Sequence, residues 1–495
     1  MKLKEILSGI EYYCRNFQNL EVRGIAINSN QVFPGYMFVA IRGEEKDGHD
    51  FVYEAIERGA SVLVVNKGFD QLMFHRNIVV IQVPDTREAI CKIAANFYGH
   101  PFRFLDIIGI TGTNGKTTVS FLLDKIFTYA GYHSGVIGTV CYRIGNREIP
   151  STNTTPDSVS LQKYMDEMVQ SGQDVLILEA SSHGLAQKRL NGIKFDCGIF
   201  TNLGKDHLDY HRDMENYYRA KKILFTELLK DNGVAIINID DEYGHRLYGE
   251  ISGEKIRYGF SPQADVRAVE YKMSFKGISF KVDVMGREIK VFSRLLGVHN
   301  IYNILAALAV AYRYNIEFSK VLYAIENFTG VRGRLERVFG SSHLKVFVDY
   351  AHTPDALENV LSTLRSLKKG RLWVVFGCGG NRYREKRAIM GEIASYLADR
   401  VIITSDNPRD ENPLDIIEDI LTGVKNKDKC EVIPARKEAI EKTIEQADIG
   451  DVILIAGKGH ERYQIVGNLV IPFDDREIAS RALIRRTMRE MANVS

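Results

Sequence analysis

Cysteine is scarce in this chain, and no two cysteines have the spacing of a metal or redox motif. The 495 residues include six cysteines and no Cys-x-x-Cys pair. They are spread along the whole chain: Cys14, Cys91, Cys141, Cys197, Cys378 and Cys430. A zinc site and a disulfide framework are therefore not indicated, and a reducing compartment is the simple interpretation.

The chain also lacks long apolar runs and an excess of charge of one sign. No apolar run approaches the length of a membrane span, and residues 1–5 open an amphipathic stretch rather than the apolar core of a signal peptide. The 65 Lys and Arg residues nearly balance the 63 Asp and Glu residues, for a net charge of +2. This balance gives no reason to expect nucleic acid or membrane insertion. We expect a soluble, cytoplasmic protein.

The length of the chain favours three domains, because one hydrophobic core does not extend over 495 residues. The strand and helix patterns predict an α/β fold with domains at residues 1–101, 102–331 and 332–495. The first is a small N-terminal α/β domain. Its predicted elements are strands at 24–27, 37–41, 61–65 and 78–83 and a helix at 51–58.

The second and third regions both predict parallel sheets. In the second, strands at 175–178, 198–201 and 234–238 alternate with helices, which is typical of a mostly parallel sheet. Residues 268–292 instead predict antiparallel hairpins, with turns at 276–277 and 285–286. The third region has strand candidates at 344–348, 372–376, 401–404 and 452–456, each followed by a polar loop and a helix. This predicts a Rossmann-like doubly wound sheet with a ligand site beyond the C-terminal ends of its strands.

Residues 111–118 have the pattern and the context of a phosphate-binding loop. An apolar run at 105–110 predicts a buried strand before the loop, and apolar residues at helical spacing predict a helix at 116–129 after it. This order points backbone N–H groups and the helix dipole at an anion. Lys116 can then reach terminal phosphates, and the Thr117 hydroxyl can bind Mg²⁺. The loop is a variant, because Ile110 stands where a full Walker A motif has glycine.

Other polar groups of the second region allow two interpretations each. Glu179 follows a strand and is well placed for a Mg²⁺ contact, or it is an acidic residue beside helix-capping serines. Residues 206–211 include four potential metal ligands, although hydrogen-bonded loop histidines are commoner. Lys221 lies on a helix, where lysines form a solvated face. Asn300 and Asn303 open another helix, which favours N-terminal capping over contact with an adenine edge.

The junction and the third region carry a second polar group. Arg334 stands where a cleft between domains would need a phosphate clamp, with an exposed linker arginine as the alternative. Asp349 and His352 follow the strand at 344–348 and face the same cleft. Pro408 stiffens the loop at 406–409, so that Arg409 has a defined direction, and the alternative is a plain turn.

Two further loops of the third region end at the same sheet edge. They carry Arg382, within residues 379–382, and Glu461, within residues 457–461. Two arginines and a carboxylate converging at one place would suit a zwitterionic amino acid.

With these motifs assembled, the chain resembles the Mur ligase family, the ATP-dependent amide-bond-forming ligases of peptidoglycan synthesis, over essentially its whole length. Its phosphate loop matches the loop of the family, including position 110. Residues 151–155, 181–185, 206–211, 349–355 and 457–461 look like the branch that adds a diamino acid. In that branch Asp-Asn-Pro-Arg marks diaminopimelate users, which implies that Arg409 holds the carboxylate that lysine lacks.

The resemblance implies roles for residues around the nucleotide. The catalytic residues would be Lys116, Glu179, His207, Lys221 and Arg334. The ligands of Mg²⁺ would be Thr117, Glu179, His207 and Lys221, and Lys221 matches the carbamylated lysine of the family, which replaces the solvated-face interpretation. The contacts of ATP would be Gly112, Thr113, Asn114, Gly115, Lys116, Thr117, Thr118, Asn303, Arg334, Asp349 and His352.

It also implies three groups for the other substrates. The muramoyl dipeptide would be held by Asn153, Thr154, Thr155, Ser181, Gln187 and Arg189. The uridine end would be held by Ile27, Ser29, Glu44, Glu45 and Lys46, where residues 28–30 read Asn-Ser-Asn in place of the usual Asp-Ser-Arg. The amino acid would be held by Arg382, Asp406, Asn407, Pro408, Arg409, Gly457 and Glu461.

The implied reaction adds meso-2,6-diaminopimelate to UDP-N-acetylmuramoyl-L-alanyl-D-glutamate through an acyl phosphate, with ATP and Mg²⁺, in a monomeric cytoplasmic enzyme. The nearest alternative is the ligase of the same branch that adds L-lysine. Folylpolyglutamate synthase has a similar phosphate loop, but the region before residue 101 and the loop at 406–409 argue against it. Another alternative is a nucleotide-dependent switch protein, but that function would not explain the polar loops of the third region.

Overall fold

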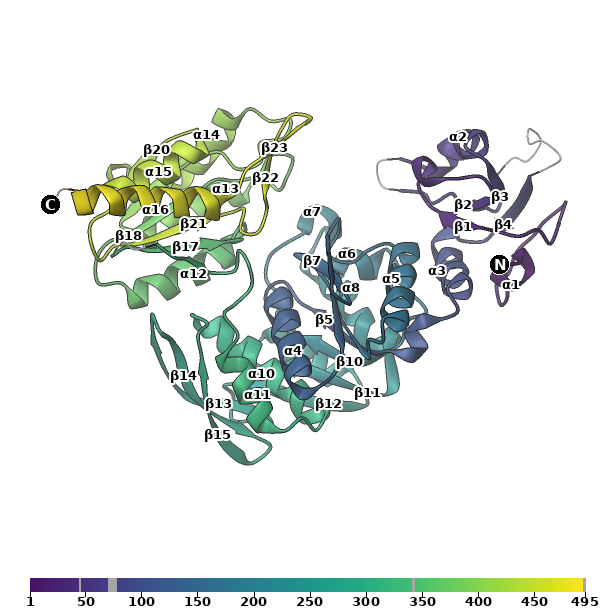
Figure 1. The fold of residues 1–495 in the computed structure, drawn as a ribbon, viewed down its shortest axis with the longest axis horizontal. Coiled ribbons are helices and arrows are strands. Elements are labelled where there is room, and N and C mark those ends of the chain that lie inside the picture. Colours follow the sequence, from purple (N-terminus) through teal and green to yellow (C-terminus); the bar gives the residue numbers. More distant parts are fainter. Residues whose placement is uncertain (44–45, 70–77, 341–342, 493–495) are drawn as a thin grey trace.

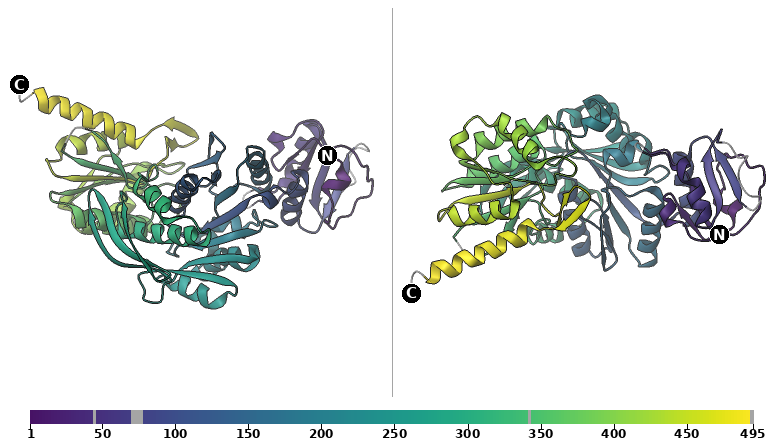
Figure 2. Two further views of the ribbon diagram at one scale, coloured as in Figure 1. Left: turned by 60° about the horizontal axis from the view of Figure 1, so that its bottom comes forward. Right: turned by 90° about the horizontal axis from the view of Figure 1, so that it is seen from above.

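The computed structural model describes residues 1–43, 46–69, 78–340 and 343–492, and Figure 1 shows three α/β units in chain order. The N-terminal and C-terminal units lie on opposite sides of the central unit in Figures 1 and 2. Their main sheets have 4, 11 and 6 strands, which confirms the predicted α/β class. In the part of the chain that is described, no helix combines the length and the apolar character needed to cross a membrane.

The N-terminal unit is a parallel four-stranded sheet with helices around it. Its elements are β1 (Gly24–Ala26), β2 (Tyr36–Val39), β3 (Ala60–Asn66), β4 (Val79–Val83), α1 (Leu3–Ile6), α2 (Val52–Glu57), α3 (Thr86–Phe97), η1 (Ser29–Gln31), η2 (Gly48–Phe51) and η3 (Pro101–Phe104). The strand order is β1-β2-β3-β4. Val62 and Val64 pack in one apolar cluster and Leu63 and Val65 in another, because alternate side chains of a strand face opposite sides. The predicted strands and helix are confirmed to within two residues.

The central unit is built on one mixed sheet. Its strands are β5 (Asp106–Thr111), β6 (Ser134–Ile137), β7 (Cys141–Ile144), β8 (Arg147–Pro150), β9 (Val175–Glu179), β10 (Phe195–Phe200), β11 (Leu229–Asn238), β12 (Glu254–Gly259), β13 (Val266–Ser274), β14 (Gly277–Val284) and β15 (Arg287–Ser293). Their order is β15-β14-β13-β12-β11-β10-β5-β9-β6-β7-β8. In this order the strands from β13 to β6 are parallel, and antiparallel hairpins extend both edges. The predicted hairpins over 268–292 are confirmed, whereas β6, β7, β8 and β12 were not predicted.

Helices cover both faces of this central sheet. They are α4 (Lys116–Ala130), α5 (Ser158–Gln170), α6 (Ser182–Ala186), α7 (Leu208–His211), α8 (Met214–Ile223), the π-helical turn η4 (Leu224–Leu228), α9 (Glu242–Glu250), α10 (Val298–Arg313) and α11 (Phe318–Glu326). Residues of α4, α10 and α11 share one apolar cluster with the sheet, and residues of α5, α6, α8 and α9 share the other. Because both faces are covered, the central strands read as apolar runs.

The C-terminal unit contains the second doubly wound sheet. Its elements are β16 (Glu336–Val338), β17 (Lys345–Asp349), β18 (Leu372–Phe376), β19 (Arg400–Ile403), β20 (Cys430–Val432), β21 (Val452–Ala456), β22 (Tyr463–Val466), β23 (Leu469–Pro472), α12 (Pro354–Leu367), α13 (Lys386–Leu397), α14 (Pro413–Gly423), η5 (Lys427–Lys429), α15 (Arg436–Gln446) and α16 (Asp475–Ala492). The order is β16-β17-β21-β18-β19-β20, with only β16 antiparallel among these strands. The four predicted strands are confirmed. The short edge strands β16 and β20 and the separate β22–β23 hairpin were not predicted.

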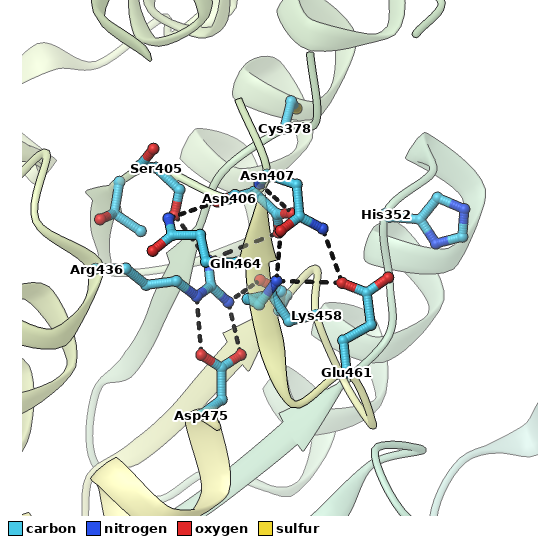
Figure 3. Close-up of polar contacts among 12 residues, drawn as sticks. His352, Cys378, Ser405, Asp406, Asn407, Arg436, Lys458, Glu461, Gln464 and Asp475 are labelled. Atoms are coloured by element: carbon cyan, nitrogen blue, oxygen red, sulfur yellow. Dashed lines mark hydrogen bonds and ion pairs between the residues drawn. The ribbon is translucent and has the colours of Figure 1, made fainter. Parts of the chain in front are cut away.

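A buried ion pair joins α15 to α16 beside this sheet (Figure 3). The side chains of Arg436 and Asp475 have no exposed surface. Arg436 donates from Nε and Nη2 to the two carboxylate oxygens of Asp475 at 2.8 and 2.7 Å, and from Nη2 to the carbonyl oxygen of Ala456 at 2.9 Å. This bidentate geometry offsets the lost hydration of both charges and fixes the start of α16.

Replacement of Asp475 by asparagine should destabilise the C-terminal unit, because the buried Arg436 guanidinium would lose its bidentate carboxylate partner and keep only Asp406, at 3.8 Å. We expect a loss of about 3 kcal/mol or more. Urea unfolding followed by the fluorescence of Trp373, the single tryptophan, reports on this unit because Trp373 lies in β18. The control is Glu445→Gln, which breaks an exposed pair with Arg489 between the same two helices and should cost less than about 1 kcal/mol. Equal losses in the two variants would contradict the assignment.

Candidate active site

The phosphate loop joins β5 to α4 and depends on two glycines. Gly112 and Gly115 have φ of 144° and 90°. A Cβ atom at position 112 would lie 1.9 Å from the Thr201 hydroxyl oxygen, and one at position 115 would lie 2.5 Å from Asn303 Oδ1. Only glycine satisfies both the backbone geometry and the close packing. The loop therefore holds its N–H groups at the start of α4, where an anion is favoured.

Glu179 lies directly behind this loop, as the sequence predicts. Its side chain is fully buried at the end of β9. Thr117 donates from Oγ1 to Glu179 Oε2 at 3.0 Å, and Thr139 donates to the two carboxylate oxygens from its backbone N–H at 3.1 Å and from Oγ1 at 2.8 Å. These three donors hold the carboxylate beside the first turn of α4. Lys116 lies next to them, with Nζ 2.8 Å from the carbonyl oxygen of Gly112.

Lys221 is buried under the same loop, so the solvated-face interpretation of its helix is wrong. Only 1% of Lys221 is exposed, because α8 packs this side chain against the loop. Its Nζ donates to the carbonyl oxygen of Gly112 at 2.9 Å and lies 4.5 Å from the ring centroid of Tyr217. Burial, and then the charge of Lys116, lower the pKa of Lys221 well below its ordinary value. A neutral amine is favoured at this position.

His207 approaches from the loop between β10 and α7. Its φ is 55°, and Nε2 lies 3.4 Å from Asp206 Oδ2. Burial lowers the pKa of His207 to about 4, against the opposing effect of Asp206. The imidazole is therefore neutral near pH 7 and has a lone pair to offer.

The prediction that Asn300 and Asn303 cap a helix is wrong. The residue before α10 is Gly297, which has no capping side chain. Asn300 donates from Nδ2 to the carbonyl oxygen of Leu296 at 2.7 Å, and Asn303 donates from Nδ2 to Asn300 Oδ1 at 2.8 Å. Both side chains are buried within the first turns of the helix, and Asn303 faces Gly115 of the phosphate loop.

Arg334 reaches from the junction of the two larger units to the phosphate loop. Its Nη2 lies 3.4 Å from Thr117 Oγ1, and its guanidinium lies 4.8 Å from the ring centroid of Tyr350. The buried Nε of Arg334 has no hydrogen-bond partner among the described residues. A side chain held in this way is not an exposed linker arginine, and it brings a positive charge beside the first turn of α4.

Asp349 ends β17, and His352 follows this strand, on the opposite side. Burial raises the pKa of Asp349 to about 6, although Arg334 and backbone donors oppose this rise. The N–H of Ala351 donates to Asp349 Oδ1 at 2.7 Å. His352 Nδ1 lies 2.8 Å from the carbonyl oxygen of Tyr350, which orients its ring.

Two cavities meet at this place. One, of 630 Å³, is lined by Thr113 to Thr118, Lys221, Asn303, Arg334 and Asp349. The other, of 1550 Å³, lies between the central and C-terminal units. Both are lined by Ser181, His207, Tyr350 and His352. The cavity lined by the predicted nucleotide residues therefore adjoins the larger cavity at these four side chains.

The larger cavity brings together predicted residues that lie far apart in the sequence. From the central unit they are Asn153, Thr154, Ser181 and Arg189, and from the C-terminal unit Arg382, Asp406, Asn407, Arg409, Gly457 and Glu461. Thr155 and Gln187 stand behind this wall: Arg189 donates to the carbonyl oxygen of Thr155 at 2.7 Å and to Gln187 Oε1 at 3.0 Å.

Arg409 is held firmly at the edge of this cavity. It has φ of 51°, and its backbone N–H donates to the carbonyl oxygen of Ile465 in β22 at 3.1 Å. Its Nη1 donates to the carbonyl oxygen of Gly380 at 2.7 Å. Arg409 therefore has a defined direction, as predicted, and the contacts that fix it are with β22 and with Gly380.

The residues predicted for uridine lie elsewhere. Ile27, Ser29 and Lys46 belong to the N-terminal unit and line neither cavity. Ser29 donates from Oγ to Glu54 Oε2 at 3.0 Å, and Asn28 accepts the N–H of Asn30 at 3.0 Å. Glu44 and Glu45 lie outside the described residues.

Several residues of the site have no assigned role in the sequence analysis. Thr139 follows β6 in a loop without a motif, so nothing in the sequence points to its two bonds with Glu179. Tyr350 and His460 stand inside quoted motifs, and their rings pack 5.0 Å apart in the wall of the larger cavity. Lys458 stands in such a motif as well and is fully buried. For Tyr350, His460 and Lys458, the sequence signal was their position next to residues with assigned roles in the same motifs.

Comparison with known proteins places this geometry in a family. Three family models match successive parts of the chain: "Mur ligase family, catalytic domain" over residues 21–98, "Mur ligase middle domain" over 110–311, and "Mur ligase, glutamate ligase domain" over 333–459. The chain is 44% identical over 484 residues to the UDP-N-acetylmuramoyl-L-alanyl-D-glutamate–2,6-diaminopimelate ligase 1 of Clostridium acetobutylicum, covering 97% of this chain and 98% of that protein.

Solved structures agree. A UDP-N-acetylmuramoyl-L-alanyl-D-glutamate–2,6-diaminopimelate ligase is 32% identical, with a TM-score of 0.69 and 99% of each chain covered. The MurF ligase from Thermotoga maritima, solved in complex with ADP, shares the fold at 19% identity, with a TM-score of 0.63 over 97% of this chain and all of that one. Near-complete coverage at these identities confirms the resemblance and the three-part architecture, and the chain belongs to the Mur ligase family.

Proposed function

We propose that this chain is an ATP-dependent ligase that joins meso-2,6-diaminopimelate to UDP-N-acetylmuramoyl-L-alanyl-D-glutamate. The observation that carries the proposal is the meeting of two cavities, with the phosphate loop in one and Arg409 and Glu461 in the other. Relatives named for this reaction match nearly the whole chain. Residues 1–101 would hold the uridine end, 102–331 the ATP, and 332–495 the amino acid.

The nucleotide end suits phosphoryl transfer from ATP. The N–H groups at the start of α4 and the Lys116 ammonium would lie against the phosphates. Arg334 stands beside Thr117 with an unpartnered Nε, so it can turn toward the transferred group. Positive charge fixed around a transferring phosphoryl group stabilises the transition state.

Mg²⁺ fits the donor groups behind the loop. Thr117 offers a hydroxyl, Glu179 a carboxylate and His207 a neutral imidazole, and Mg²⁺ prefers oxygen ligands. Among the described residues, no group of three or more His, Cys, Asp or Glu side chains could hold a metal ion. A carbamate on Lys221 and the phosphate oxygens of ATP would complete the set. When bound, the ion would neutralise phosphate charge.

The γ-carboxylate of D-glutamate would attack the terminal phosphate of ATP and become an acyl phosphate, with release of ADP. The amine of diaminopimelate would then add to the acyl carbon, and phosphate would leave as the amide forms. If the C-terminal unit closed on the central unit, so that His352 and Tyr350 covered Ser181, water would be kept from the acyl phosphate. All six cysteines are free thiols, which fits an enzyme that works in a reducing cytoplasm.

Transfer of ¹⁸O tests the acyl phosphate. With ¹⁸O in the γ-carboxylate of the UDP-linked dipeptide, one labelled oxygen should appear in the inorganic phosphate, because that oxygen bridges carbon and phosphorus in the intermediate. Mass spectrometry of the released phosphate measures this. Phosphate without the label would rule out the intermediate, and a reaction without the dipeptide serves as the control.

Lys221→Met should lower activity about a hundredfold or more, because carbon dioxide could no longer form a carbamate on the amine. In wild-type enzyme equilibrated with ¹³C-bicarbonate, ¹³C NMR should show a carbamate signal that is absent from the variant. The control is Lys222→Met: Lys222 follows directly in the sequence and pairs with Glu250 at 2.8 Å. It should keep both the signal and the activity. A carbamate signal that persisted in Lys221→Met would contradict the assignment.

Arg409→Ala should weaken the preference for diaminopimelate over L-lysine, because the guanidinium would pair with the carboxylate that lysine lacks. Loss of a charge-assisted hydrogen bond costs about 1.5 to 3 kcal/mol, which is roughly a ten- to hundredfold change in relative kcat/KM. A phosphate-release assay with each amino acid measures it. Arg481→Ala, which removes an exposed arginine of α16, is the control. Unchanged selectivity in Arg409→Ala, or equal use of lysine by the wild type, would favour the lysine-adding alternative.

A further inference from the structure

The loop that carries Arg409 contacts a fully buried lysine, Lys458. Figure 3 shows Lys458 beside Asn407 and Glu461. The side chain of Lys458 has no exposed surface. Its Nζ donates to Asn407 Oδ1 at 2.9 Å and to Glu461 Oε2 at 3.1 Å. Asn407 in turn donates from Nδ2 to the same oxygen of Glu461 at 2.9 Å. The three side chains close a triangle of hydrogen bonds beside the larger cavity.

Two glycines direct Lys458 inward. Gly457 and Gly459 have φ of 115° and 52°. A Cβ atom at position 457 would lie 2.5 Å from Asp406 Oδ2, and one at position 459 would lie 2.6 Å from the Cβ atom of Tyr350. Only glycine on each side of Lys458 allows the backbone to come this close to its neighbours. The lysine between them is built into the interior of the loop cluster.

The charges nearby make Glu461 the partner of this lysine. A buried ammonium requires an opposite charge. Arg436 already pairs with Asp475, and Asp406 lies 3.8 Å from Arg436. The bonds from Lys458 and Asn407 both end on Oε2 of Glu461, so Oε1 is the oxygen that can accept from a ligand in the cavity.

The same triangle reaches Arg409 through the β22–β23 hairpin. Asn407 Oδ1 accepts the backbone N–H of Ile465 at 3.0 Å as well as Nζ of Lys458. Ile465 accepts the backbone N–H of Arg409, and Gly467 donates to the carbonyl oxygen of Arg409 at 2.8 Å. One amide oxygen thus links the lysine to the hairpin that fixes the Arg409 backbone.

We propose that Lys458 is a positioning residue for selection of the amino acid. It holds the Glu461 carboxylate directly and the Arg409 backbone through Asn407, so that an ammonium and a carboxylate of the incoming diamine meet partners at a fixed spacing. Lys458 itself does not touch the substrate. The inference rests on the proposed function, since it concerns how the same site recognises diaminopimelate.

Lys458→Met tests this role, because it keeps the length of the side chain and removes the charge and the donors. The KM for diaminopimelate should rise about tenfold or more, and the preference over L-lysine should fall by a similar factor. The KM for ATP should stay within about twofold, because the nucleotide groups are separate. Lys442→Met, which removes a half-exposed lysine of the same unit, is the matched control. An unchanged KM and preference, or equal rises in the KM of ATP and of the diamine, would overturn the proposal.

A second pair of variants covers the case in which Lys458→Met folds poorly, since it leaves Glu461 without its cation. Glu461→Gln combined with Lys458→Met contains neither charge of the pair. In Glu461→Gln alone, Lys458 still donates to Asn407, so the double variant should lose a further part of the preference over L-lysine, about tenfold, through Arg409, while the KM for ATP stays within about twofold. An unchanged preference relative to Glu461→Gln, or an equal rise in the KM for ATP, would overturn the proposal.

The first measurement determines which amino acid the wild type couples. It separates a failure of the proposed function from a failure of the positioning role. A wild type that does not couple diaminopimelate contradicts the proposed function. The Lys458 variants are then assayed with the amino acid that the wild type does use. A rise confined to the KM of that amino acid still supports the positioning role, and its absence overturns that role alone.

Discussion

Burial of ionisable side chains at the ends of parallel strands is the constraint on which this site depends. A buried charge must be paired, hydrogen-bonded or neutralised. Glu179 satisfies this with three donors, and Lys458 satisfies it with the carboxylate of Glu461. Lys221 contacts a carbonyl oxygen instead, and its pKa falls well below the ordinary value. The two buried lysines thus have different surroundings: Lys458 has a carboxylate oxygen at 3.1 Å, whereas Lys221 has a carbonyl oxygen at 2.9 Å and the charge of Lys116 nearby.

The arrangement of the sheets explains why these groups meet. β5, β9 and β10 end at one edge of the central sheet, and β17, β19 and β21 end at one edge of the C-terminal sheet. The loops that follow these strands carry the polar motifs, as expected for doubly wound sheets. Arg334, at the junction of the two units, lies against Thr117 of one unit and Tyr350 of the other. The site therefore exists only where the two edges face each other.

Local pattern was sufficient for most of the fold. The apolar strand before the phosphate loop, the glycine turn and the helix after it have short-range signals, and β5 and α4 agree with the prediction. The edge strands β16 and β20 have three residues each, too few for a periodic signal to stand out. The β22–β23 hairpin has most of its residues exposed on both sides, so alternation of apolar and polar residues is weak there. The capping prediction for Asn303 was wrong because an asparagine that caps a helix and an asparagine buried near a helix start have the same local sequence.

The sequence by itself determined most of the central strands and the helices between them, the phosphate loop and the family resemblance, because these depend on residues close together in the chain. Only the tertiary structure decided which charges are buried and what each of them contacts. Lys221 lies 109 positions from Gly112, and Lys458 lies 51 positions from Asn407. Packing between distant segments decides whether an amine is buried and which oxygen lies nearest to it. No local pattern of residues distinguishes a solvated lysine from either of these two.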